Sequence, residues 1–245
     1  MLLIKSLYAW IYGITVLILV FPFTVIIWLV TYPFGHSDMA ITRMINFQAL
    51  ILSNTIPLWK ISVYGRENMV PKQNYIVVSN HQSALDIPFI HKIKLLFKWI
   101  SKIENFKVPI LGQSMAMAKY IKIDRGNIES ATALMKDATE ILNKGESLAI
   151  FPEGTRSKDA EIKRFKTGAF KLAMITGTPI LPVVIDGTAA ILPKKGIIFS
   201  SGHRVTIKIL KPVLPEDFGT DNPDILTKNF RALFVDELAK LRNQQ

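Results

Sequence analysis

The sequence predicts an α/β fold, with a mixed, largely parallel sheet covered by helices and an N-terminal membrane-associated helical module. Two observations support this. Residues 6–37 contain no Asp, Glu, Lys or Arg, and from residue 59 onward short β-rich runs alternate with helical patterns. Such alternation is typical of a sheet with helices on its faces. We therefore divide the 245 residues into membrane-anchoring helices over 1–58 and an α/β domain over 59–245.

The charge balance and the lack of cysteine narrow the class of protein. Lys and Arg total 30 against 19 acidic residues, a net charge of +11. This excess favours an anionic partner, which can be nucleic acid, anionic lipid or a phosphorylated substrate. Without cysteine the chain has no thiol nucleophile, disulfide or cysteine-ligated zinc, which fits a reducing compartment. We expect a membrane-associated protein whose main domain lies on the cytoplasmic face.

The uncharged N-terminal segment exceeds the roughly 18 apolar residues that mark a membrane helix, and it is much longer than the core of a secretory signal. Pro22 lies near its middle and would kink a helix that ran through it. Two arrangements remain open: one tilted, kinked span, or a re-entrant pair of shorter helices in a single leaflet. Aromatic residues near the two ends suit interfacial anchoring: Tyr8, Trp10, Trp28 and Tyr32.

A second helix is predicted within residues 37–59. Ile41, Ile45 and Leu52 recur at helical spacing. Either Ser37 or Asp38 can cap its N-terminus. An amphipathic helix of this kind can lie on a membrane or pack on the domain, and the sequence leaves both readings open.

The rest of the chain supplies seven predicted strands and three clear helices. The strands are rich in β-branched and aromatic residues and cover residues 59–65, 75–80, 98–103, 120–124, 147–152, 180–185 and 204–210. The helices cover residues 128–143, about 167–176, and 223 to about 241. Asn127 and Asn222 are the expected caps, and Pro223 suits a first helical position.

Polar segments follow three of these strands: SNHQSALD, DRGN and PEGTRS. In sheets of this class, sites form beyond the carboxyl ends of the strands. His81 and Asp86 can face each other only if His81 precedes the next helix and Asp86 lies in its first turn, which a cap at Ser83 permits. A carboxylate bonded to one imidazole nitrogen leaves the other nitrogen as a general base.

The other polar segments supply cations. Arg156 stands between Thr155 and Ser157 in a turn that Gly154 permits, and such a donor-rich turn suits phosphate. Further basic residues follow other strands or precede a predicted helix: Arg125, Lys163, Arg164 and Lys166. A base surrounded by cations predicts a substrate with a phosphate beside the reacting atom.

The segments NHQSALD, IDR, FPEGTRS and LPVVI, in this order, resemble the four motifs of the glycerolipid acyltransferases. The resemblance covers about residues 60–190 and is strongest to the enzymes that act on 1-acylglycerol 3-phosphate. It implies transfer of a fatty acyl group from an acyl thioester, either acyl-CoA or acyl carrier protein, to the 2-hydroxyl of 1-acylglycerol 3-phosphate. The product would be phosphatidate, made for phospholipid biosynthesis, with no metal, other cofactor or nucleic acid involved.

The resemblance also implies roles for individual residues. His81 corresponds to the general base and Asp86 to the carboxylate that orients it. Pro182, in the fourth motif, is linked to binding of the acyl donor. The residues associated with the glycerol phosphate are Arg125, Glu153, Gly154, Thr155 and Arg156, and Lys166 joins them as a nearby cation. In the second motif Lys119 and Lys122 replace the usual Gly and Phe.

Several alternatives remain. The acceptor can be another lysophospholipid or glycerol 3-phosphate. A serine hydrolase is suggested by GQSMA at residues 112–116, although Ala replaces the last Gly of the elbow motif. Another alternative, a basic, membrane-attached protein that binds nucleic acid, is supported by net charge alone. A metal site built from His81, Asp86 and His91 would have a spacing that matches no common ligand set.

Overall fold

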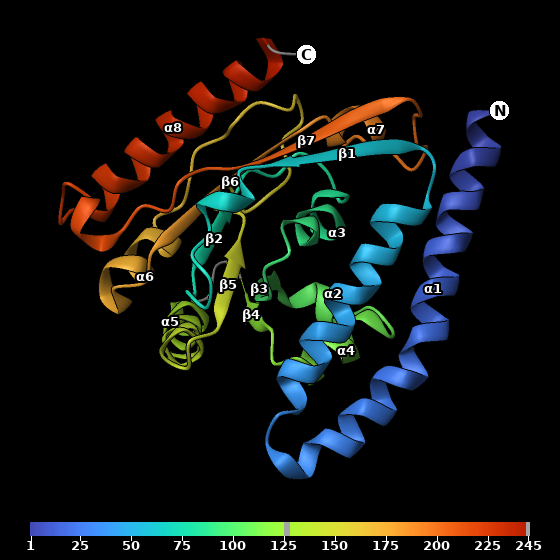
Figure 1. Ribbon diagram of the computed structural model, residues 1–245, viewed down its shortest axis with the longest axis horizontal. Helices are drawn as coiled ribbons and strands as arrows, with labels where there is room; N and C mark the ends of the chain where they lie inside the picture. Colours follow the sequence, from blue (N-terminus) through green and yellow to red (C-terminus); the bar gives the residue numbers. More distant parts are fainter. Residues whose placement is uncertain (125–127, 244–245) are drawn as a thin grey trace.

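The structure is a computed structural model that describes residues 1–124 and 128–243. Within these residues seven strands form one sheet in the order β1-β7-β6-β2-β5-β3-β4 (Figure 1). Neighbouring strands are parallel except β6 and β7. The mixed, largely parallel sheet is therefore confirmed, and every predicted strand is present: β1 Trp59–Tyr64, β2 Ile76–Ser79, β3 Phe97–Lys102, β4 Ile121–Ile123, β5 Ser147–Ile150, β6 Ile180–Asp186 and β7 His203–Ile209.

Helices cover both faces of the sheet. On one face lie α2 Ser37–Thr55, α3 Asp86–Ile90, α4 Leu111–Met117 and α7 Thr188–Ile191; on the other lie α5 Ile128–Asn143, α6 Gly168–Thr176 and α8 Pro223–Asn243. Short 3-10 turns complete the chain: η1 Tyr32–Phe34, η2 Arg66–Asn68, η3 His91–Ile93, η4 Ile103–Lys107 and η5 Pro215–Asp217. Because side chains alternate along a strand, Val77 joins one core while Ile76 and Val78 join the other.

The predicted helix ends are partly confirmed. The Asn222 side-chain oxygen accepts hydrogen bonds from the backbone N–H of Asp224 at 2.8 Å and of Ile225 at 3.3 Å, so it caps α8 as expected. The expected cap Asn127 lies outside the described residues. The cap predicted for α2 is wrong, because this helix begins at Ser37 without a side-chain cap and Asp38 is used elsewhere.

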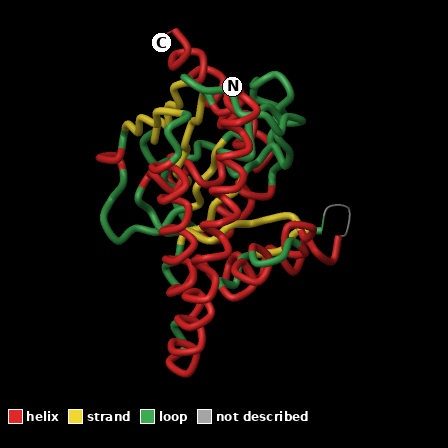
Figure 2. Tube along the Cα trace, turned by 90° about the vertical axis from the view of Figure 1, so that its right-hand side faces the viewer, coloured by secondary structure: helices red, strands yellow, loops and turns green. Residues whose placement is uncertain are grey.

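The N-terminal segment forms a helical hairpin. The first helix, α1 Leu2–Thr31, continues through Pro22, and α2 returns along it (Figure 1). The hairpin tip projects away from the sheet in both views (Figures 1 and 2). By length and composition, the segment Leu2–Phe34 is long and apolar enough to cross a membrane, and only 6% of its most apolar stretch is buried in the protein. The inner face of α2 packs on the domain, where Ile41 is fully buried.

Polar bonds fix the beginning of α1 to the domain. The indole N–H of Trp10 donates to the Ile197 carbonyl at 2.8 Å, and the Phe199 N–H donates to the Ser6 hydroxyl at 2.8 Å. Lys5 donates to the Ser201 hydroxyl at 3.1 Å. The hairpin and the α/β domain are therefore joined at the start of α1 as well as along α2.

A buried lysine ties α2 to the sheet. Lys98, in β3, is 2% exposed, and its ammonium lies 2.7 Å from an Asp38 oxygen and 2.6 Å from a Glu146 oxygen. Burial alone would raise the pKa of Asp38, but the hydrogen bond and positive charge of Lys98 outweigh it, so this pKa lies below its usual value. One cation thus joins the start of α2 to β3 and to the turn before β5.

We expect Lys98→Met to destabilise the fold by about 3–5 kcal/mol, because Glu146 loses its cation and Asp38 keeps only the exposed Lys119, 4.0 Å away. Thermal unfolding in detergent, followed by circular dichroism, measures the change. Lys102→Met is the matched control on the same strand, since Lys102 forms an exposed ion pair with Glu104 and should contribute less than about 1 kcal/mol. Equal unfolding temperatures for the two variants would contradict the prediction.

Candidate active site

Two of the three polar segments predicted to meet, SNHQSALD and PEGTRS, do so at the carboxyl ends of the central strands. The strands β6, β2 and β5 are parallel neighbours. Their carboxyl ends lead into Thr188, His81 and Glu153, respectively. The segment after β4 is described only as far as Asp124, so the predicted phosphate ligand Arg125 lies outside the described residues.

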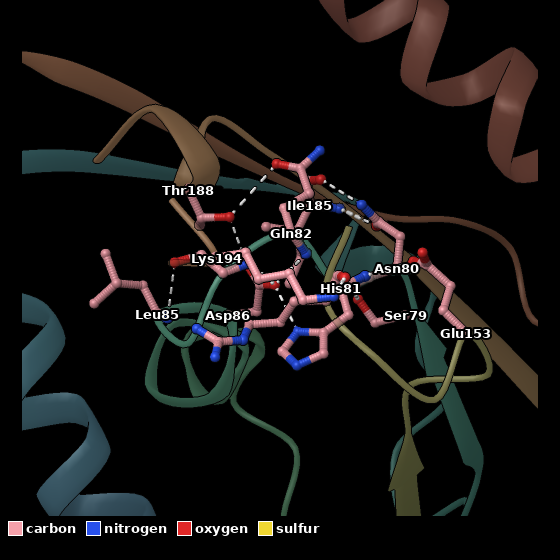
Figure 3. A network of polar contacts seen from close by, with 12 residues as sticks. Ser79, Asn80, His81, Gln82, Leu85, Asp86, Glu153, Ile185, Thr188 and Lys194 are labelled. Atoms are coloured by element: carbon pink, nitrogen blue, oxygen red, sulfur yellow. Dashed lines mark hydrogen bonds and ion pairs between the residues drawn. The ribbon is translucent and has the colours of Figure 1, made fainter. Parts of the chain in front are cut away.

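His81 and Asp86 form the predicted pair. His81 lies on the turn after β2, Asp86 is the first residue of α3, and the distance from Nδ1 to Oδ2 is 2.9 Å. The carboxylate is fully buried and accepts three further hydrogen bonds (Figure 3). The donors are the Gln82 N–H at 2.6 Å, the Ser83 N–H at 2.8 Å and the Thr188 hydroxyl at 2.5 Å.

These contacts set the protonation pattern of the imidazole. A carboxylate that accepts backbone N–H bonds is itself an acceptor, so Nδ1 of His81 carries the proton and donates to Asp86. The second nitrogen, Nε2, is then left with a lone pair. The His81 ring stacks on Phe151 with centroids 3.9 Å apart and planes 7° apart, which fixes the ring plane. The pair can therefore act as an oriented general base.

The role predicted for Ser83 needs correction. We expected Ser83 to cap a helix that begins at Ala84. Its hydroxyl does accept from the Leu85 N–H at 3.3 Å, and it also donates to the Leu192 carbonyl at 2.7 Å. The helix begins only at Asp86, because residues 83–85 form a turn. Ser83 consequently joins this turn to the chain after α7.

The buried side chain of Glu153 bonds to the backbone on both sides of the site. Its side chain is 6% exposed, and its two oxygens accept hydrogen bonds from the His81 N–H at 2.8 Å and the Lys163 N–H at 3.2 Å. Burial raises the pKa of Glu153, and the two backbone hydrogen bonds partly oppose that rise. A carboxylate that is buried and fully engaged does not receive a phosphate, so Glu153 positions the loop behind His81.

Arg156 was predicted to bind phosphate, and its position in the structure suits that role. It lines the same cavity as His81, and within residues 1–124 and 128–243 its guanidinium has no hydrogen-bond or ion-pair partner. Gly154 adopts the left-handed φ of +68° that the turn requires, and the Lys166 Cε lies 3.1 Å from where a Cβ would stand. Arg156 is thus free to bind an anion beside the base.

Sequence reasoning missed Lys194, which lies after α7. Its ammonium donates to the Thr155 hydroxyl at 3.1 Å and to the Arg156 carbonyl at 2.7 Å. The pKa of Lys194 is lowered, mainly by partial desolvation and to a smaller extent by nearby positive charges. These charges belong to Lys163, Lys158, Arg156 and Lys195. The cation-rich loop is therefore held from a segment that no predicted motif contains.

Asn80 and Thr188 were also missed as positioning residues. The fully buried Asn80 amide donates to the Ile185 carbonyl and accepts from the Ile185 N–H, each at 2.8 Å. Thr188 bonds to Asp86 as described above. Asn80 stands within the first motif and could have been noted there, but no local signal identifies Thr188.

Two other predicted ligands lie farther from the base. Lys166 is exposed and lines a small apolar cavity of about 100 Å³ on the α5 and α6 side of the sheet. Pro182 is buried in the middle of β6, opposite Val78, and lines neither cavity in the described part of the chain. Any effect of Pro182 on binding of the acyl donor would therefore have to act through its neighbours.

An apolar cavity of about 410 Å³ leads away from His81. This volume falls within the roughly 300–1,000 Å³ of small-molecule pockets. His81, Thr155 and Arg156 are among its polar lining residues, together with Gln48, His91, Ser101, Lys102, Asn105 and Tyr120. Its apolar walls come from the hairpin, α3, α4 and β3, through Leu17, Ile45, Ala49, Leu52, Ile87, Trp99, Leu111 and Met115.

Neither the hydrolase nor the metal alternative gains support from the geometry. Ser114 is buried within α4 and donates to the Ile110 carbonyl at 2.8 Å, so it is not on a strand-to-helix elbow. His91 contacts Asn46 at 3.0 Å and accepts from the Trp99 indole at 3.3 Å, and burial lowers its pKa to about 3. The described residues contain no group of three or more His, Cys, Asp and Glu placed to hold a metal ion.

The fold and the site therefore define an α/β enzyme with a bonded His81–Asp86 pair beside a cation-rich loop and an apolar cavity. A sequence model of the family described as Acyltransferase matches residues 60–186, which is more than half of the chain. This protein belongs to that acyltransferase family.

Individual relatives give a finer comparison. The chain is 40% identical over 160 residues to a chloroplastic 1-acyl-sn-glycerol-3-phosphate acyltransferase of Arabidopsis thaliana, covering 64% of this chain and 44% of that protein. It is 36% identical over 159 residues to a 1-acyl-sn-glycerol-3-phosphate acyltransferase of Borreliella burgdorferi, covering 63% of each. The match spans about half the length of the chloroplastic and algal relatives.

A solved structure confirms the fold over nearly the whole chain. The crystal structure of the 1-acyl-sn-glycerophosphate acyltransferase PlsC of Thermotoga maritima superposes with a TM-score of 0.84 at 28% identity. The superposition covers 98% of this chain and 95% of that one. The likeness therefore includes the N-terminal hairpin as well as the α/β domain.

We expect Glu153→Gln to destabilise the fold by about 1–3 kcal/mol, because the amide group would place a donor against one of two backbone N–H groups. Amide hydrogen exchange should become faster at His81 and Lys163, and thermal unfolding should occur at a lower temperature. Glu161→Gln is the control, since its side chain is 62% exposed and pairs only at the surface with Arg242. Unchanged exchange at His81 would refute the positioning role of Glu153.

Proposed function

We propose that this protein transfers a fatty acyl group from an acyl thioester to the 2-hydroxyl of 1-acylglycerol 3-phosphate, giving phosphatidate. One observation carries the proposal: the oriented His81–Asp86 pair stands beside an apolar cavity and the free guanidinium of Arg156. The acceptor is supported by the names of the relatives. Another lysophospholipid or glycerol 3-phosphate is the second candidate acceptor.

The proposed reaction is a direct transfer. Nε2 of His81 takes the proton of the 2-hydroxyl as that oxygen attacks the thioester carbonyl, and the collapse of the tetrahedral intermediate breaks the C–S bond. The imidazolium then gives its proton to the departing thiolate, which leaves as the thiol. A thioester is already activated, so no acyl-enzyme, metal or other cofactor is needed. Asp86 holds the tautomer and stabilises the imidazolium that forms.

Arg156 is the proposed ligand of the acceptor phosphate. A guanidinium binds a phosphate through two parallel, charge-assisted hydrogen bonds. Arg156 is unpaired within the described chain and lines the cavity with His81. The phosphate on carbon 3 of the glycerol would thereby hold the neighbouring 2-hydroxyl close to the base. Acyl-CoA and acyl carrier protein both remain candidate donors.

We further propose that the protein is membrane-associated through the hairpin, with its α/β domain on the cytoplasmic face. The lipid substrate and product partition into bilayers, so an enzyme held at the interface meets both. The start of α1 is bonded to residues 197–201 of the domain, and α2 lies along α1. Because both ends of the hairpin are held at the domain, we favour a hairpin that lies in one leaflet over a helix that crosses both leaflets.

His81→Ala should lower kcat by about 10²–10⁴-fold, because the general base is lost. The assay is phosphatidate formation by the detergent-purified protein from oleoyl or palmitoyl thioesters and 1-acylglycerol 3-phosphate. Glycerol 3-phosphate and a zwitterionic lysolipid, offered in parallel, test the acceptor. Equal turnover by the variant would sink the mechanism, whereas activity on another acceptor alone would change the proposed substrate.

Arg156→Gln should raise KM for 1-acylglycerol 3-phosphate by about tenfold or more, since it removes a hydrogen bond between charged groups worth about 1.5–3 kcal/mol. Arg204→Gln is the control, because Arg204 is exposed on β7 and lines neither cavity. Steady-state kinetics with varied acceptor measure the effect. The same KM in both variants would show that the phosphate binds elsewhere.

Ala49→Leu should shift donor preference towards shorter acyl thioesters. Ala49 is 7% exposed on α2 and lines the 410 Å³ cavity, so a larger side chain excludes part of the proposed acyl chain. Each methylene left in water costs about 0.8 kcal/mol, or about fourfold in kcat/KM. The ratio of lauroyl to palmitoyl transfer measures the shift, and the exposed Ala232→Leu in α8 is the control. An unchanged ratio would place the acyl chain outside this cavity.

A further inference from the structure

The segment between α7 and β7, residues 192–202, is an ordered loop with an apolar tip. Its base is closed by the hydrogen bond from the Ser200 N–H to the Ile191 carbonyl at 2.9 Å. Phe199 is 4% exposed and packs against Trp10 and Trp59, with ring centroids 5.3 and 6.0 Å away. The base of the loop is therefore part of the hydrophobic core.

The tip of this loop exposes two adjacent isoleucines. Ile197 is 73% exposed and Ile198 is 44% exposed, and one glycine separates them from the exposed Lys195. An isoleucine side chain that stays in water lacks the roughly 1.5–3 kcal/mol of stabilisation that full burial would give. Contiguous exposed apolar residues in a loop with a well-packed base are typical of a contact surface.

The tip continues the exposed apolar face of α1. Trp10 of α1 donates its indole N–H to the Ile197 carbonyl, so the two segments touch. On the same end of α1, Leu3, Leu7 and Ile11 are 67%, 61% and 55% exposed. The start of α1 lies beside the chain that follows α7 (Figure 1). Helix and loop thus present one apolar surface rather than two.

The charges at this surface fit an anionic partner. Lys5, Lys194 and Lys195 belong to the same two segments, and Lys5 is bonded to Ser201 at the base of the loop. Lysines beside inserted apolar side chains contribute about 1 kcal/mol each towards binding anionic lipid headgroups. A bilayer matches both the continuous apolar surface and its basic rim, whereas a protein partner would have to cover the helix as well.

We infer that the 192–202 loop is a membrane contact additional to the hairpin tip and continuous with the start of α1. It inserts Ile197 and Ile198 at the interface while Lys195 meets anionic headgroups. This inference does not depend on acyl transfer. It fixes the orientation of the α/β domain on the bilayer, because a rigid body with two separated contacts cannot rotate about the hairpin. Lys194 in the same loop bonds to Thr155 and Arg156, so the cation-rich end of the cavity is held close to the headgroup layer.

The absence of cysteine makes a depth measurement direct. Ile197→Cys carries an environment-sensitive fluorophore at the loop tip. Ile175→Cys is the matched water-exposed control, since Ile175 is 68% exposed on α6, across the sheet. Ile18→Cys, from a position 51% exposed on α1, is the lipid-exposed reference. The full chain is reconstituted in phosphatidylcholine vesicles containing phosphatidylglycerol, with and without lipids that carry a doxyl quencher.

We expect the labels at positions 197 and 18 to shift to shorter emission wavelength and to be quenched by the doxyl lipids, while the label at 175 is not. A label at 197 that behaves like the one at 175, with the label at 18 quenched, would overturn the inference. A label at 197 that responds to an acidic carrier protein in detergent, and not to vesicles, would also overturn it and identify a protein-binding surface. None of these readouts requires enzymatic activity, so a failure of the proposed reaction would leave them interpretable.

Discussion

The buried carboxylate of Asp86 is the interaction on which the site depends. A charge removed from water is tolerated only when donors surround it, and Asp86 has four: the His81 ring, two backbone N–H groups and the Thr188 hydroxyl. These donors come from the turn after β2 and from the start of α7. Satisfying one charge therefore fixes the tautomer of the base and the junction between two neighbouring strands at once.

A second layer of bonds holds the donors themselves. Gln82 donates to an Asp186 oxygen at 3.1 Å, and Arg242, near the end of α8, lies 3.4 Å from the same oxygen. Arg242 also donates to the Ala160 carbonyl at 2.9 Å, which restrains the loop after Glu153. The last helix of the described chain thus supports the site from the side opposite the cavity, and a small set of polar contacts connects α8 to the residues around His81.

Much of this architecture could be predicted because it depends on residue patterns that are local in the sequence. The strands and the helices α5, α6 and α8 follow from residue periodicity, and α8 also from its Asn222 cap. The His81–Asp86 geometry follows from a strand end that lies shortly before a helix start. The rest depends on partners that are distant in sequence. Nothing near Lys194 or Thr188 indicates that they reach the first and third motifs. Spacing does not reveal which way a loop carboxylate turns, so the bonds from Glu153 to the backbone of His81 and Lys163 were not expected. The helix after Ser83 begins later than predicted because tertiary bonds as well as caps set where helices start.

The separation in sequence between these partners has a consequence for synthesis of the protein. The bonds from Asn80 to Ile185, from His81 to Glu153 and from Asp86 to Thr188 span 105, 72 and 102 residues. Contacts between residues this far apart in sequence form slowly in folding, because the entropy cost of closing a long loop must be overcome first. While a ribosome is still translating the segment before β6, the apolar hairpin has long been available to a bilayer but Asp86 has no Thr188. The order of synthesis therefore exposes the apolar hairpin before the bonds around Asp86 can form, so the hairpin is available while the site is still incomplete.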